Sequence, residues 1–140
     1  MYYKKVLVPL DGSPHASLAC RHAVALAQGS GMELVLLYCY GELPAAIGGD
    51  ARDDIIRLSE EEGTAILEPC KRHCEENNVP CKTIIRSGGP GRTIVLTSQS
   101  EGCDLIVMGS RGLSDFSGMV MGSVSHRVLR HSTVPVLIVR

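Results

Sequence analysis

The sequence lacks any apolar stretch close to the roughly 20 residues that a membrane-spanning helix needs. It also lacks an excess of either charge, because 14 Lys and Arg residues face 15 Asp and Glu residues. This balance argues against general affinity for nucleic acid or for an anionic membrane. The first residues run into a strand pattern and not into a signal peptide. We therefore expect a cytoplasmic protein with no nucleic-acid or membrane partner.

Six cysteines are present, but none of them forms a CxxC pair. Cys70 and Cys74 lie four residues apart on a predicted helix, with His73 between them. Helical spacing would put both thiolates on one face, where they could ligate a metal. The favoured interpretation is free and mostly buried thiols in a reducing compartment, where cysteine acts as a small hydrophobic residue. It covers all six positions, which are Cys20, Cys39, Cys70, Cys74, Cys81 and Cys103.

Strand and helix patterns alternate along the whole chain, with no internal repeat and no linker. A length of 140 residues suits one domain and one core, so we expect a single domain over residues 1–140. Ser13 and Pro14 predict the capped start of the first helix. The second helix could be disturbed at Gly63 and Pro69. The strands are predicted at 6–10, 34–38, 82–86, 105–108 and 134–139, the later helices at 53–77, 92–100 and 123–130, and a long loop at 40–50.

This alternation predicts a parallel five-stranded sheet between two layers of helices, a three-layer α/β/α sandwich. The third strand is the most polar, and Pro135 lies near the start of the fifth, so both suit sheet edges. A strand order of 3-2-1-4-5 follows. In this order the connections change direction between strands 1 and 4, where open α/β sheets bind ligands.

Two glycine-containing turns meet at that position. Strand 1 leads into Asp11-Gly12-Ser13, and strand 4 leads into the segment 109–123, at whose end a helix begins. Glycines let backbone approach a phosphate closely, and the N–H groups of a helix start attract an anion. No Walker A lysine is present. The plainer alternative is that the glycines only form turns and that Ser123 only caps its helix.

The spacing Gly109-x2-Gly112-x9-Gly122-Ser123 resembles the G-2x-G-9x-G-(S/T) signature of the ATP-binding branch of the universal stress protein family. The resemblance extends to the opening segment 5–13 and to the closing segments 123–131 and 134–139. It therefore covers nearly the whole chain. It implies a Rossmann-like or flavodoxin-like fold with the same strand order.

The resemblance also implies a set of nucleotide contacts, with ATP as the ligand and Mg²⁺ as an optional companion. The glycines and their neighbours would contact the triphosphate and ribose, whereas strand 1 would line the nucleoside. Backbone groups near the end of strand 2 would face the adenine edge. The predicted contacts are Pro9, Leu10, Asp11, Leu37, Tyr38, Met108, Gly109, Ser110, Arg111, Gly112, Gly122, Ser123, Val124 and Ser125.

Hydrolysis would need a positioned base as well as a phosphate site. Asp11 is the acidic candidate in the two turns, and a lone histidine near a helix start, such as His15 or His126, is more often structural. We therefore expect a stress-response regulatory or signalling module with little or no hydrolysis. A slow ATPase or phosphotransferase using Asp11, and a nucleotide-independent dimeric interaction domain, remain as alternatives.

The last predicted strand, 134–139, would be an apolar sheet edge if it were left unpaired. Antiparallel pairing across a two-fold axis would bury it, and members of the resembled family commonly dimerise in this way. We therefore expect a homodimer.

Overall fold

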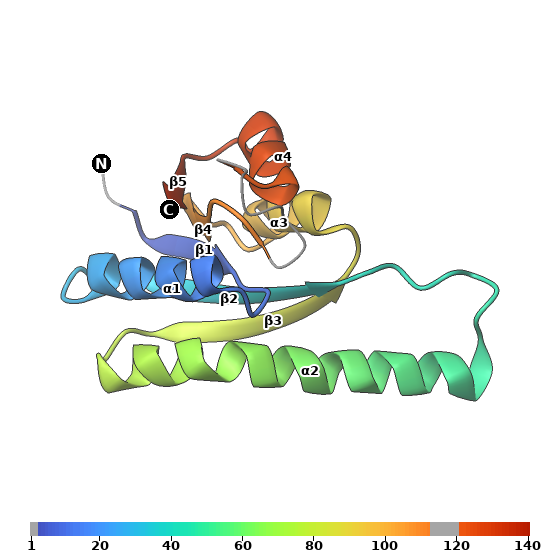
Figure 1. Ribbon diagram of the computed structural model, residues 1–140. Coiled ribbons are helices and arrows are strands. Elements are labelled where there is room, and N and C mark those ends of the chain that lie inside the picture. The colour runs from blue at the N-terminus through green and yellow to red at the C-terminus, as the bar shows by residue number, and fades with distance from the viewer. Residues whose placement is uncertain (1–2, 113–120) are drawn as a thin grey trace.

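The computed structural model describes residues 3–112 and 121–140, so the middle of the predicted loop 109–123 lies outside the described residues. Strands and helices alternate in the predicted sequence, and the two helical layers enclose the sheet (Figure 1). The elements are β1 (Lys5–Pro9), α1 (Pro14–Ala27), β2 (Glu33–Tyr40), α2 (Gly49–Glu76), β3 (Cys81–Ser87), α3 (Pro90–Ser100), β4 (Leu105–Gly109), α4 (Ser123–His131) and β5 (Val136–Val139).

The sheet is parallel, with the order β3-β2-β1-β4-β5, which confirms the predicted order. Alternate residues of the central strands pack on opposite faces, as a parallel sheet covered on both sides requires. Val6 and Val8 join the core under α1 and α2, whereas Leu7 joins the core under α3 and α4. All three side chains are at most 2 % exposed.

The first helix begins as predicted. Ser13 is its N-cap, the Ser13 side chain accepts a hydrogen bond from the Ala16 backbone N–H at 3.2 Å, and Pro14 follows at the first helical position. The Ser13–Pro14 pair therefore fixes where α1 starts, just after β1.

The second helix is longer than predicted and continuous through Gly63 and Pro69. It begins at Gly49, four residues before the predicted start. Hydrogen bonds hold the preceding turn against this helix, because the Arg52 guanidinium donates to the backbone carbonyls of Pro44 at 3.3 Å and Ile47 at 3.1 Å.

The cysteine prediction was wrong for two of the six residues. Cys20 of α1 and Cys70 of α2 form a disulfide with a Cα–Cα separation of 6.1 Å. Cys70 is therefore no partner for Cys74 in a thiolate metal site. The four remaining cysteines, Cys39, Cys74, Cys81 and Cys103, are free.

Candidate functional site

A pocket of about 310 Å³ opens at the carboxyl ends of β1, β2 and β4. We call it the switch-point pocket, because the connections change direction between β1 and β4, where open α/β sheets bind ligands. Eleven of the fourteen predicted residues line it. The eleven are Pro9, Leu10, Asp11, Leu37, Tyr38, Met108, Gly109, Arg111, Gly112, Val124 and Ser125.

The three predicted residues outside the lining are Ser110, Gly122 and Ser123. Ser110 is buried, and its N–H donates to the Val139 carbonyl at 2.9 Å. Its own carbonyl accepts hydrogen bonds from the Gly122 N–H and from the Ser125 hydroxyl, the latter at 2.8 Å. These bonds join the end of β4 to the start of α4. The Ser125 hydroxyl, which was predicted as a ligand contact, therefore holds the Ser110 backbone in place.

The start of α4 has the character of an anion site. Its N-cap is Gly122, with no side-chain cap hydrogen bond, so Ser123 is the first helical residue and not the cap. The N–H groups of a first helical turn have no partners within the helix and carry partial positive charge. Val124 and Ser125, in this turn, line the pocket directly. This end of α4 therefore directs positive potential into the pocket.

Gly109 has a packing role of its own. A Cβ atom on Gly109 would lie 2.8 Å from the His15 carbonyl carbon and 2.8 Å from the His15 Cβ. Only glycine allows the first turn of α1 to lie so close to the end of β4. This close approach explains a glycine at position 109 by packing alone.

Among the described residues, the charged groups that line the pocket are Asp11, Glu62 and Arg111. The Asp11 carboxylate accepts a hydrogen bond from the Ser13 N–H at 2.9 Å, which fixes the turn before α1. The Arg111 Nη2 atom lies 3.3 Å from His15 Nε2. Because a guanidinium can only donate, that ring nitrogen acts as the acceptor.

Sequence reasoning missed the wall that α2 contributes. Glu62 and Ile66 of this helix line the pocket, together with Ser13, Ala16, Cys39, Pro90 and Ile94 from other elements. A signal was present in Gly63, where a Cβ atom would lie 2.5 Å from Tyr38 Cδ2. A glycine inside a helix indicates such a close approach. Burial, followed by the neighbouring Glu62 carboxylate, raises the pKa of Tyr38 above its ordinary value.

The universal stress protein family model matches residues 2–140. The chain is 37 % identical to the universal stress protein YxiE of Bacillus subtilis, with 99 % of each chain covered. Its structure is similar to that of protein MJ0577 of Methanocaldococcus jannaschii, with a TM-score of 0.90 at 32 % identity and 99 % and 96 % of the two chains covered. It is also similar to a universal stress protein in complex with cAMP, with a TM-score of 0.78 at 25 % identity and 100 % and 99 % covered.

Among the described residues, no helix combines the length and the apolar character needed to cross a bilayer. The family match extends over almost every residue of the sequence, and the parallel sheet has the order expected from the resemblance. The chain belongs to the universal stress protein family.

Proposed function

We propose that this protein binds an adenine nucleotide, with ATP as its ligand, and acts as a regulatory or signalling module in the stress response. The observation that carries the proposal is the meeting of the switch-point pocket with the start of α4. The volume of the switch-point pocket, about 310 Å³, suits a small ligand. The similar universal stress protein described in complex with cAMP supports an adenine nucleotide.

The two ends of the pocket suit the two ends of a nucleotide. Leu37, Ile94 and Met108 are buried apolar residues that would cover the faces of the base. The Leu37 carbonyl already accepts a hydrogen bond from the Leu10 N–H at 2.8 Å, so the strand end is held in place. The phosphates would lie toward Gly112 and the first turn of α4, where backbone N–H groups attract anions.

Two observations support binding with little or no hydrolysis. The sequence has no Walker A lysine to neutralise charge that develops on a transferred phosphate. The Asp11 Oδ1 atom accepts the Ser13 N–H, and Glu62 lies beside Tyr38 on the α2 wall, so both carboxylates have structural contacts. When Mg²⁺ accompanies the phosphates, Asp11 would hold it through bound water.

The test is calorimetry of ATP binding, with mass spectrometry of any nucleotide released from freshly purified and denatured protein. We expect an adenine nucleotide in the released fraction. Gly122→Leu should weaken ATP binding at least about 100-fold, because a bulky residue at the N-cap of α4 would hinder close approach of a phosphate to this helix start.

Gly48→Leu is the matched control. Gly48 is the glycine N-cap of α2, it also has a negative φ, and a Cβ atom there meets nothing within 4 Å. This variant should keep the wild-type affinity. Unchanged affinity in Gly122→Leu would contradict the assignment of the site. Sustained phosphate release that is lost in Asp11→Asn would instead favour the ATPase alternative.

We also propose a homodimer formed by antiparallel pairing of β5. This strand is an edge of the sheet, and the Leu137 side chain is 40 % exposed. An unpaired apolar edge tends to associate with another strand. Light scattering at micromolar concentration should give twice the monomer mass, and a monomer mass would contradict the proposal.

A further inference from the structure

The Cys20–Cys70 disulfide joins the two helices that wall the switch-point pocket. Ala16 of α1 and Ile66 of α2 line that pocket. Cys20 and Cys70 each lie four residues further along the same helices, and residues four apart share one helix face. The covalent bond therefore links α1 and α2 one helical turn away from the residues that line the switch-point pocket.

A second pocket, of about 480 Å³, lies between these two helices, and we call it the interhelical pocket. Cys20 and Cys70 both line it, and both belong to the core cluster beneath it, at 4 % and 6 % exposure. At the carboxyl ends of the helices, a hydrogen bond of 3.3 Å from Gln28 to Asn77 provides a second link. The disulfide is thus the covalent link between α1 and α2, which also share one core cluster on the sheet.

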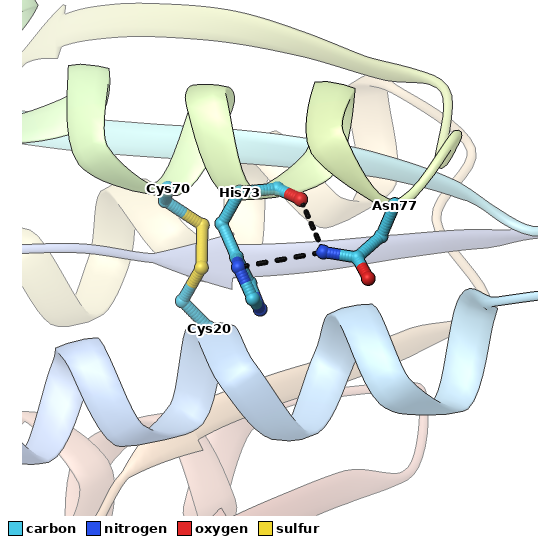
Figure 2. The surroundings of a disulfide bond; sticks show 4 residues. All are labelled: Cys20, Cys70, His73 and Asn77. Carbon is cyan, nitrogen blue, oxygen red and sulfur yellow. Dashed lines mark hydrogen bonds between the residues drawn. A yellow bond between two sulfur atoms is a disulfide. The ribbon is translucent and has the colours of Figure 1, made fainter.

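The interhelical pocket is the side from which a small thiol would approach the two cysteines, since both of them line it. Among the residues that the structure describes, Arg21 and Arg72 line it with one carboxylate, that of Glu76. Arg72 also lies 3.9 Å from the Glu68 carboxylate, with the two side chains 62 % and 47 % exposed. Figure 2 shows the His73 ring extending from α2 beside the disulfide, with its Nδ1 atom 3.4 Å from the Asn77 amide nitrogen. Positive charge around a sulfur stabilises a leaving thiolate.

We propose that the Cys20–Cys70 disulfide is a reversible strap, opened through the interhelical pocket by an anionic thiol, and that its opening lowers the affinity of the switch-point pocket for nucleotide. The affinity part of this proposal rests on the proposed function. Ala16, Ile66 and Leu10 line both pockets, so a change in one reaches the other through shared side chains.

The chemistry is thiol–disulfide exchange. A thiolate attacks one protein sulfur, the S–S bond breaks, and the departing cysteine thiolate takes a proton. A second thiol resolves the mixed disulfide. The protein gains two thiols, and two molecules of the small thiol become one oxidised disulfide. Reoxidation reverses these steps with a small-molecule disulfide as the oxidant.

The first experiment measures ATP affinity by calorimetry in oxidised and reduced protein, with free thiols counted by alkylation and mass spectrometry. Reduction with a phosphine should weaken ATP binding about five- to tenfold in the wild type, because fewer molecules keep the pocket spacing. The variant Cys20→Ser/Cys70→Ser should show the weaker affinity with or without the phosphine. Circular dichroism establishes that each form is folded. Equal ATP affinity of oxidised and reduced wild type would overturn the strap while leaving nucleotide binding intact.

If neither form binds ATP, the proposed function fails and the strap is judged by hydrogen exchange. Faster exchange in the first turn of α1 upon reduction supports the strap, and unchanged exchange overturns it. The exchange route is tested with glutathione, which is anionic, and with neutral 2-mercaptoethanol. The ratio of their reduction rates should fall about three- to tenfold in Arg21→Gln/Arg72→Gln. An unchanged ratio would overturn entry through the interhelical pocket.

Discussion

The switch-point pocket and the interhelical pocket share Leu10, Ala16 and Ile66, yet their other walls have different origins. The first pocket is lined by strand ends and glycine turns, and the second is lined mainly by side chains of α1 and α2 around a buried disulfide. Parallel strands of a sheet must end together, so the first pocket follows from topology. The second depends on how two helices pack side by side on one face of the sheet. The comparison therefore separates a site set by the fold from one set by particular side chains.

The largest expected effect comes from removing the disulfide beneath the interhelical pocket. The variant Cys20→Ser/Cys70→Ser should lower the free energy of unfolding by about 4 kcal/mol, because the bond closes a loop with a sequence separation of 50. Urea unfolding measures the change. Domains of this size have about 5–15 kcal/mol of stability, so the variant should remain folded in water.

Reduced wild type is the matched control for this variant and should unfold at the same urea concentration. If the unfolding midpoint of the wild type is the same with and without reductant, the disulfide does not stabilise the helix pair. The interhelical pocket would then differ from the switch-point pocket in its lining residues, and not in a stabilising covalent bond.

A smaller loss of stability is expected from the switch-point pocket. Gly109→Ala should lower the free energy of unfolding by about 2–3 kcal/mol, because the new Cβ atom would lie 2.8 Å from the His15 backbone. Thermal and urea unfolding measure the change. The close approach of α1 to β4 would have to relax, and α1 carries walls of both pockets.

Gly41→Ala is the control, since a Cβ atom at Gly41 meets nothing within 4 Å and no positive φ is present there. Its effect should stay within about 0.5 kcal/mol. A Gly109→Ala variant as stable as Gly41→Ala would show that the end of β4 adapts readily. The glycine at 109 would then be explained by ligand approach alone.

The strand order was predictable from the sequence because its signals are local, whereas the residues expected at the switch-point pocket came from the family resemblance. Apolar runs mark β1, β2 and β4, and glycine turns mark their ends. The Cys20–Cys70 pairing had no such signal, because spacing along a chain does not reveal which cysteines meet. The pairing depends on α1 and α2 packing against the same sheet face. The wall formed by Glu62 and Ile66 was missed for the same reason, and only the glycine at 63 indicated a close helix contact.

The last prediction concerns the thiol of the switch-point pocket, Cys39. Burial raises its pKa to about 12, although nearby Arg86 acts in the opposite direction. The thiolate is the reactive species, and a raised pKa makes it scarce at neutral pH. The greater intrinsic nucleophilicity of a high-pKa thiolate offsets part of this. Cys39 should therefore react with iodoacetamide at least about 30-fold more slowly than a free cysteine with an ordinary pKa.

The pH profile separates this cause from simple steric protection. Below its pKa, a thiol becomes about tenfold more thiolate with each pH unit. The Cys39 rate should therefore rise through pH 7 to 9.5 without levelling, whereas an ordinary thiol levels near pH 9. Peptide mapping by mass spectrometry follows Cys39 alone, and Cys39→Ser identifies its peptide. A plateau near pH 9 would contradict the raised pKa. A continuous rise would establish that the thiol in the switch-point pocket stays protonated at neutral pH, unlike a cysteine that serves in thiol–disulfide exchange.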